Sequence, residues 1–235
     1  MEKLSLAKYN IEIHKDKGVG YWRNLYLEFI ELMDFDSIIE FGSGSPSFLN
    51  KIEAKRKVAL DSGDKYIKSF NESGIEFHEL DFDKDIMPDL GTFDIAICSD
   101  VFEHLLYPDK TLYNIKTSLT KKGILFSHVP NEFTFKKTIQ VMLGISESLY
   151  FHKNCEEYSD PHLHRFTKTG YEKFLKLHFK YNLFISDLKY NSKLKLLNFL
   201  KIPIPYTFQN GPTFISTNDL NSYNHMIDLK RKLSL

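Results

Sequence analysis

The sequence predicts an α/β fold: a doubly wound, mostly parallel sheet with helices on both faces and a last strand antiparallel to the others. Short apolar segments of strand length alternate, over residues 37–131, with segments whose apolar residues recur at helical spacing. Runs such as "SIIEF" and "FDIAIC" are continuously apolar, as expected for parallel strands that are buried on both faces. The chain has 235 residues, 42% of them hydrophobic, which is enough for the core of one α/β domain.

The elements follow in chain order. An amphipathic helix is expected over residues 19–34. Strands are expected at 37–42, 57–61, 77–81, 93–100 and 123–129, with helices at 46–54, 64–72 and 109–119. Later elements are a helix within 132–165, a helix at 168–179, and strands at 182–190 and 213–217. We expect one domain over 1–235, made of an N-terminal helical segment (1–35), a ligand-binding core (36–131), a cap over the carboxyl edge of the sheet (132–165) and a C-terminal completion of the sheet (166–235).

Composition excludes several classes of protein. Lys plus Arg equals Asp plus Glu at 31 each, so no overall field favours nucleic acid. Cys98 and Cys155 are far apart without a CxxC motif, which argues against a zinc or disulfide framework and fits a reducing cytoplasm. We expect no signal peptide and no integral membrane contact. For residues 193–206, "KLKLLNFLKIPIPY", we expect buried packing, and the alternative is peripheral contact with a membrane or a lipid-linked substrate.

The segment "IIEFGSGSP" (38–46) predicts a ligand site. Gly42 and Gly44 follow the first strand, and open α/β sheets bind ligands beyond the carboxyl ends of their strands. Asp61 ends the second strand, where an acid accepts the hydroxyls of an adenosine ribose. The alternatives are a plain tight turn for the glycines and a helix cap for Asp61, with Ser62 and Asp64 as its rivals. A dinucleotide and S-adenosylmethionine both carry the ribose.

The local chemistry favours the second cofactor. A pyrophosphate needs free backbone N–H groups at a helix N-terminus, and Pro46 removes one of them. Glu40 would repel the same anion, whereas a carboxylate attracts the sulfonium and ammonium of S-adenosylmethionine. Ser47 also breaks the GxGxxG pattern.

At this point the chain resembles the class I S-adenosylmethionine-dependent methyltransferases, which have a Rossmann-like sheet. The resemblance is carried by "IIEFGSGSP", "VALD", "ELDFDKD" and "GTFDIAICSDVFEHLLYPDKTLYNIKTSLTKKGILFSHVPN". It covers roughly residues 36–131 and is weaker at "HLHRFTKTGYEKFL". Pro46 stands where the family often has a third glycine. We expect it to be the first residue of the helix at 46–54, with Ser45 as the cap.

The resemblance implies roles for individual residues. Asp61 would hold the ribose. Ser99 and Asp100 would lie under the sulfonium side. The glycine segment would line the methionine part of the cofactor through Glu40, Gly42, Ser43 and Gly44. Asp81 and Phe82 would face the adenine, with a turn cap and a core position as their respective alternatives.

Histidines are the candidates for chemistry. Methylation of an oxygen requires loss of its proton, and an imidazole is suited to accept it. The candidates for this base are, in order, His104, His164 and His128. Candidate substrate contacts are Asn131, His162, His164 and Tyr21, although Tyr21 and Trp22 also fit a helix core. Three residues could imitate a metal site, namely His162, His164 and Asp160. Two histidines and a carboxylate often occur together by chance, and we expect no metal there.

A small molecule under the 132–165 cap is the expected acceptor. The absence of an "NPPY"-like stretch and the balanced charge argue against nucleic acid. We favour an oxygen of a carbohydrate-type metabolite. The alternatives are a lipid, quinone or amine acceptor, and a non-catalytic module that binds S-adenosylmethionine. An NAD-dependent oxidoreductase is least favoured because of Glu40 and Pro46.

Overall fold

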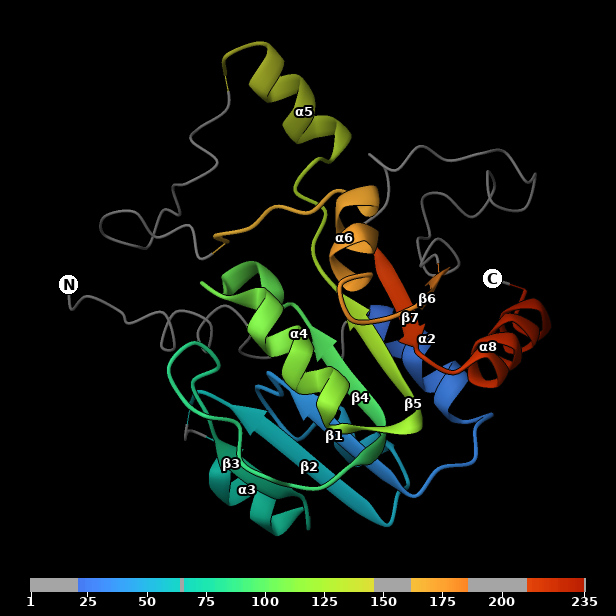
Figure 1. Cartoon of the computed structure of the whole chain (residues 1–235). Coiled ribbons are helices and arrows are strands. Elements are labelled where there is room, and N and C mark those ends of the chain that lie inside the picture. The colour runs from blue at the N-terminus through green and yellow to red at the C-terminus, as the bar shows by residue number, and fades with distance from the viewer. Residues whose placement is uncertain (1–20, 64–65, 146–161, 186–210, 235) are drawn as a thin grey trace, which may run out of the picture.

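A seven-stranded sheet forms the centre of the protein, and its strand order is β3-β2-β1-β4-β5-β7-β6 (Figure 1). The computed structural model describes residues 21–63, 66–145, 162–185 and 211–234. The strands are β1 (Ser37–Phe41), β2 (Arg56–Asp61), β3 (Glu76–Glu79), β4 (Phe93–Ser99), β5 (Leu119–His128), β6 (Tyr181–Ile185) and β7 (Thr213–Thr217).

The first five strands are parallel, whereas β7 lies between β5 and β6 and is antiparallel to both. The predicted fold class and the antiparallel last strand are therefore confirmed. Parallel pairing places the carboxyl ends of β1, β2, β4 and β5 at one edge of the sheet.

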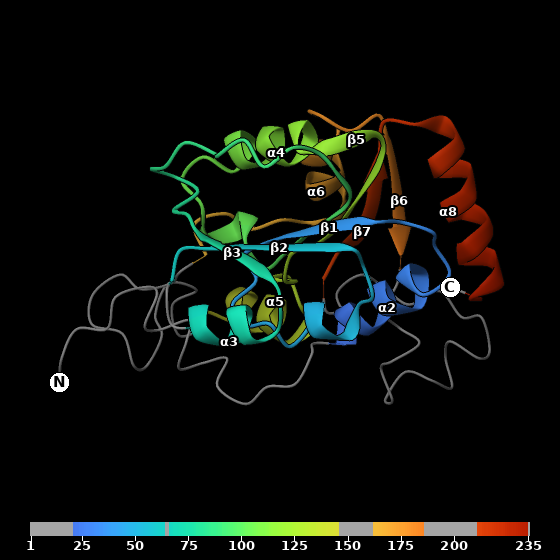
Figure 2. The same cartoon turned by 90° about the horizontal axis from the view of Figure 1, so that it is seen from below.

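Helices cover both faces of this sheet, as Figure 2 shows: α4 and α6 lie on one face, and α2 and α3 lie on the other. The α-helices are α2 (Tyr21–Ile30), α3 (Ile67–Glu72), α4 (Pro108–Thr117), α5 (Phe135–Met142), α6 (Lys168–Leu175) and α8 (Leu220–Lys232). Two 3-10 helices are η1 (Leu49–Lys51) and η2 (Phe102–His104).

The core consists of two apolar clusters separated by the sheet. Alternate residues of β4 serve different clusters: Ala96 and Cys98 pack with α4 and α6, whereas Ile95 and Ile97 pack with α2, α3 and α8. This two-residue period follows from the alternation of side chains along a strand. Each large apolar side chain buried in this way stabilises the fold by about 1.5–3 kcal/mol.

Two sequence predictions fail at the level of single helices. Residues 46–54 do not form an α-helix, since only η1 and turns occur there, and the hydroxyl of Ser45 contacts Ser47 and caps no helix. Three residues of low helix propensity, "SPS", follow Gly44 and explain the loss. Helix α8 was missed because its sequence is mostly polar. Asp219 caps it by accepting the N–H of Ser222 at 2.8 Å, while Met226 and Leu229 are its buried contacts.

The helix expected within 132–165 is α5, which stands above the carboxyl edge of the sheet in Figure 1. Several predictions fall outside the described residues: residues 146–161 of the expected cap with Cys155, the second half of the strand at 182–190, and residues 193–206. Among the helices that the structure describes, none has the length and apolar character to cross a membrane.

Candidate functional site

The loop after β1 brings its backbone close to the segment that follows β4. Gly42 has φ +72°, and a Cβ on it would lie 2.3 Å from Cγ2 of Val101. Its N–H donates to the carbonyl of Leu60 at 2.8 Å, which ties the loop to the end of β2. Gly44 has φ +61° but no atom within 4 Å of a Cβ, so its requirement is conformational and the space beside it is open.

Asp61 fixes this loop through its carboxylate. It accepts the N–H of Gly44 at 2.8 Å and the N–H of Gly63 at 3.2 Å. Burial raises the pKa of Asp61, and these backbone donors oppose that shift. Helix α3 has Tyr66 as its N-cap, so Asp61 does not fill the alternative role of capping α3. A partly buried carboxylate at the end of the second strand is therefore oriented toward the glycine loop.

Glu40 is paired with Arg23, a residue that the sequence analysis did not single out. Glu40 is 1% exposed, and an Nη2 atom of Arg23 in α2 lies 3.0 Å from its Oε1. Burial raises the pKa of Glu40 to about 7, while Arg23 lowers it. Arg23 also lies over the ring of Phe48 at 5.2 Å. The edge thus presents a cation and an anion together, and Arg23 partly compensates the charge of Glu40.

Ser99 and Asp100 lie at the carboxyl end of β4. Ser99 is buried, and its hydroxyl lies 3.0 Å from the hydroxyl of Tyr26. Asp100 has φ +55°, a backbone conformation that is strained by about 1–3 kcal/mol for a residue other than glycine. Its N–H donates to the carbonyl of His128 at 3.0 Å, and burial raises the pKa of its carboxyl to about 7. Such strain is typical of functional positions.

Asp81 and Phe82 lie after β3. The carboxylate of Asp81 accepts the N–H of Asp83 at 3.1 Å and pairs with Nζ of Lys84 at 2.7 Å. These bonds, led by the one to Lys84, lower the pKa of Asp81. Phe82 is 7% exposed and packs on Phe41 with ring centroids 5.8 Å apart. Both residues therefore have the structural contacts given as their alternatives, and contact with an adenine stays a prediction.

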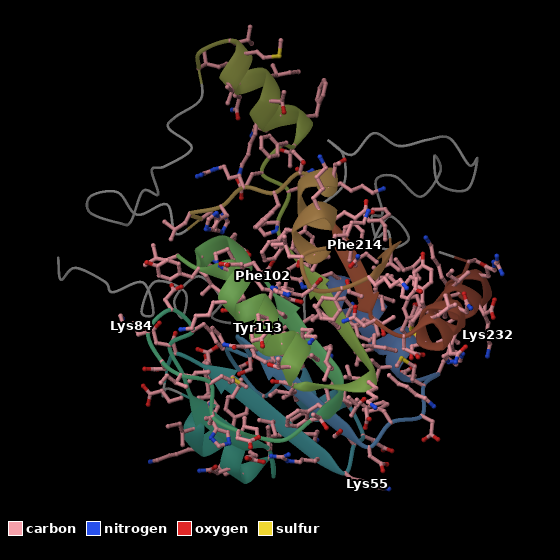
Figure 3. The ribbon with its side chains drawn as sticks, viewed as in Figure 1. Lys55, Lys84, Phe102, Tyr113, Phe214 and Lys232 are labelled. Carbon is pink, nitrogen blue, oxygen red and sulfur yellow. The ribbon has the colours of Figure 1, made fainter. Side chains whose placement is uncertain are left out.

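A cluster of acids and imidazoles lies beyond β4 and β5. Glu103 and His104 are in η2, which Phe102 anchors by packing against Phe174 of α6 at 5.1 Å. Figure 3 labels Phe102 near the middle of the view, above Tyr113 of α4, and Lys55, just before β2, at the lower edge. The rings of His104 and His162 lie 4.8 Å apart, edge to face. The structure thus joins residues that are far apart in the sequence.

Glu132 completes this cluster, and the sequence analysis missed it. Its Oε1 lies 2.9 Å from Nδ1 of His162, and Lys137 pairs with its Oε2. The hydrogen bond from His162 and the pairing with Lys137 lower the pKa of Glu132 to about 2. Asn131 is buried, and its side chain accepts the N–H of Phe133 at 2.8 Å, which shapes the turn.

The remaining histidine candidates occupy different surroundings. The N–H of His164 donates to the carbonyl of Glu103 at 3.0 Å, which fastens the 162–166 segment to η2. His128 is 2% exposed, its Nδ1 lies 2.8 Å from the hydroxyl of Thr213, and Trp22 stacks on it at 4.6 Å. Burial lowers the pKa of His128 to about 3. This ranks His128 last as a base at neutral pH.

Of the other predicted residues, Tyr21 begins α2, but its side chain lies outside the described residues, as does Asp160. Trp22 is partly buried against the second core cluster, in agreement with the core alternative. A sequence signal existed for Arg23, as a basic residue inside an apolar helix. Nothing in the spacing of Glu132 distinguished it from a surface acid.

A cavity of about 390 Å³ lies at the opposite edge of the sheet. Its lining includes Asp36, Asp94, Lys122 and His225, and the first three lie near the amino ends of β1, β4 and β5. Ligands of open α/β sheets bind at the carboxyl edge. We therefore place the functional site at the end of the sheet that holds Asp61 and Glu103.

Comparisons with known proteins agree with this geometry. Residues 14–178 match the family described as the methyltransferase domain. The plantazolicin methyltransferase BpumL, solved with a triazolic desmethylPZN analog and SAH, has a TM-score of 0.60 and 17% identity, with 92% of each chain covered. A S-adenosylmethionine-dependent methyltransferase from Clostridium acetobutylicum has a TM-score of 0.57 and 14% identity, with 89% of this chain and 95% of that one covered. One from Thermotoga maritima has a TM-score of 0.54 and 15% identity, with 85% and 91% covered. No curated protein sequence matches the chain.

The chain belongs to the methyltransferase-domain family, and its sheet has the fold of the class I S-adenosylmethionine-dependent methyltransferases. The methyl donor of this class is S-adenosylmethionine. The residues present fit that cofactor. Asp61 offers carboxylate oxygens, and Glu40 is a buried acid that is paired with Arg23 but accepts no well-aligned hydrogen bond within the described residues. Beside Gly44 the space is open.

Proposed function

We propose that this protein transfers a methyl group from S-adenosylmethionine to an oxygen of a small molecule, with a carbohydrate-type metabolite as the preferred acceptor class. One observation carries the proposal. The glycine loop held by Asp61 and the cluster of Glu103, His104 and His162 lie at the same edge of the sheet, joined by the segment after β4. This arrangement supports a cofactor site next to a polar acceptor site at that edge.

Different residues bind different parts of the cofactor. The carboxylate of Asp61 accepts hydrogen bonds from the ribose hydroxyls of the cofactor. Glu40 attracts the ammonium group, and Arg23, already 3.0 Å from Glu40, attracts the carboxylate of the same methionine moiety. We propose that Ser43, Ser99 and Asp100 line the cofactor site between the ribose and the methionine moiety. This arrangement suits a ligand that carries both charges, and it suits a pyrophosphate less well.

The acceptor side orients a hydroxyl and removes its proton. S-adenosylmethionine supplies a methyl carbon already activated by a sulfonium, so the protein has to position the acceptor and exclude water. His104 is the first candidate for the group that assists proton removal, because it lies beside His162 and Glu103 at the carboxyl edge. His164 is second. We propose that Asn131 and His162 contact the acceptor.

A small molecule is supported as the acceptor by the balanced charge of the chain, which offers no electrostatic footprint for nucleic acid. The plantazolicin methyltransferase, which has a similar fold, was solved with a triazolic desmethylPZN analog and SAH, and we take this as support for a small acceptor. A lipid, quinone or amine acceptor, or binding without catalysis, is the alternative. We also propose that the whole chain is one domain, with 132–165 as its cap.

Calorimetric titration with S-adenosylhomocysteine, with NAD as the control ligand, tests the cofactor. We expect micromolar binding of S-adenosylhomocysteine only, weakened about 100-fold in Asp61→Ala because two charge-assisted hydrogen bonds of about 1.5 kcal/mol each are lost. Asp36→Ala, at the amino edge, is the matched control and should bind as wild type. Preference for NAD would overturn the proposal.

The acceptor is tested with labelled S-adenosylmethionine and a panel of nucleotide-sugars, quinones and amines. Transfer of label to a sugar hydroxyl or carboxyl is the expected result. Transfer only to amines or quinones would reject the carbohydrate class while leaving the methyltransferase assignment in place.

A further inference from the structure

Glu103 is a buried acid whose carboxylate has no hydrogen-bond partner among the described residues. Its side chain is 2% exposed. An isolated carboxylate in such a place costs several kcal/mol unless a proton or a cation neutralises it. The position of Glu103 at the carboxyl edge raises the question of which cation it would meet.

Two imidazoles converge on the same point. One ligand atom from each of Glu103, His104 and His162 can be chosen so that all three lie within 4.8 Å of one another. Nε2 of His104 is 3.8 Å from Oε1 of Glu103. Ligands about 2.1 Å from a tetrahedral metal ion are about 3.4 Å apart. Side-chain movements of about 1 Å would therefore bring the three ligand atoms close enough together to bind one metal ion.

Neighbouring groups fix the positions of the three candidate ligands, as the residues around a metal centre fix its ligands. Glu132 contacts Nδ1 of His162 at 2.9 Å, and this pairing fixes the ring and assigns the role of metal ligand to Nε2. The bond from the His164 N–H to the Glu103 carbonyl, at 3.0 Å, keeps the loop of His162 against η2. The site is thus held both by a side chain and by the backbone.

The charges at this place favour a cation. Two further acids lie near the three groups: Glu132 contacts His162, and Asp100 stands three residues before Glu103 in the same segment. Arg23 pairs with Glu40, and Lys137 pairs with Glu132. Neither ion pair involves Glu103, so its carboxylate is available to a divalent ion.

We propose that Glu103, His104 and His162 bind a divalent transition-metal ion, with Glu132 as the residue that positions His162. Two imidazoles and one carboxylate suit Zn²⁺, Mn²⁺, Fe²⁺ or Co²⁺ better than Mg²⁺ or Ca²⁺, which prefer oxygen ligands. The sequence analysis expected no metal at His162, His164 and Asp160. The structure instead places His162 beside two residues of a different segment.

The metal deepens the proposed function, on which its catalytic role rests. The ion has open positions for an acceptor hydroxyl and lowers the pKa of that hydroxyl, which releases its proton to solvent. An oxygen–carbon bond then forms as the carbon–sulfur bond breaks, giving a methylated oxygen, S-adenosylhomocysteine and one proton. In this state His104 and His162 act as ligands, and the ion takes over the task assigned above to a base.

Cobalt binding tests the site directly. The full chain is stripped with a chelator and titrated with Co²⁺, whose visible absorption reports its ligands, and in parallel with Zn²⁺ by calorimetry. We expect one ion per chain, with affinity weakened at least about 100-fold in Glu103→Gln and His162→Ala, and about 10–100-fold in Glu132→Gln. His78→Ala is the matched control, because His78 forms a surface pair with Glu76 at 2.7 Å. It should bind Co²⁺ as wild type.

The outcomes separate the two proposals. Absence of Co²⁺ and Zn²⁺ binding to wild type, or equal affinity in Glu103→Gln and His162→Ala, would overturn the metal site. If circular dichroism shows that Glu103→Gln is unfolded, His162→Ala alone decides. S-adenosylhomocysteine is titrated into the same preparations: its binding without Co²⁺ binding rejects only the metal, and the converse rejects only the cofactor assignment.

Discussion

The two halves of the site are built in different ways. The cofactor half, around Gly42, Gly44 and Asp61, is local in sequence and held by backbone hydrogen bonds and positive-φ glycines. The acceptor half, around Glu103 and His162, is assembled from distant segments and held by buried charges and imidazoles. The first half should therefore respond to changes of backbone shape, and the second to changes of charge and pH.

The largest expected effect comes from Gly42→Ala, which tests the backbone half. The new Cβ would lie 2.3 Å from Val101 Cγ2 in a residue with φ +72°. Overpacking and strain together should destabilise the protein by about 4 kcal/mol. Gly44→Ala is the matched variant, since it has the strain without the clash, and should lose only about 1–2 kcal/mol. Urea unfolding measures both, and equal losses would contradict the packing argument.

His128→Asn tests the charged half through pH. The folded-state pKa of His128 is about 3, below its ordinary value of 6.5, so its contribution to stability is lost as pH falls from 6.5 toward 3. Relative to the variant, wild type should lose up to about 1.4 kcal/mol per pH unit, and about 2.3 kcal/mol in all between pH 6.5 and 4.5. Parallel stability curves for the two proteins over that range would refute the buried neutral imidazole.

Glu40→Gln should show the opposite sign. The folded-state pKa of Glu40 is about 7, above its ordinary 4.5, so the ionised form is disfavoured by folding and wild type loses stability as pH rises from 4.5 to 7. The pairing with Arg23 limits the effect, and we expect wild type to lose about 2 kcal/mol relative to the variant between pH 5 and 7. Thermal melts across this range measure it. A constant difference would show that Arg23 fully compensates the charge.

The smallest expected effect is that of Tyr26→Phe, at the boundary between the two halves. It removes the 3.0 Å contact between the hydroxyls of Tyr26 and Ser99, both buried. Loss of one buried hydrogen bond should cost about 1 kcal/mol. The affinity for S-adenosylhomocysteine should change less than threefold, by calorimetry. A loss near that of Asp61→Ala would assign Ser99 a direct place in the cofactor pocket.

The cofactor half was largely predictable because its signals are local. Gly42, Gly44 and Asp61 follow recognisable strands, and parallel pairing of β1 with β2 brings them together by necessity. The helix at 46–54 was predicted wrongly because spacing alone does not weigh the low helix propensity of "SPS". Helix α8 was missed because its sequence is mostly polar, and Met226 and Leu229 are its buried residues.

The acceptor half was only partly predictable. His104 and His162 were chosen as single residues, whereas Glu132 and Arg23 were not chosen at all. A lone acid or base carries no periodic signal, and its role depends on which distant side chain it meets. The burial that shifts the pKa values of Glu40, Asp100 and Glu103 is likewise a property of the packed chain.

The sequence by itself determined the α/β sheet, the position of the glycine loop and the family of the chain, because strand periodicity and short motifs are written along consecutive residues. Only the tertiary structure decided that Glu103, His104 and His162 meet, and that Arg23 reaches Glu40. Such contacts join residues separated by tens of positions. They form when two helices and a returning loop pack on one edge of the sheet, an event that depends on the whole core.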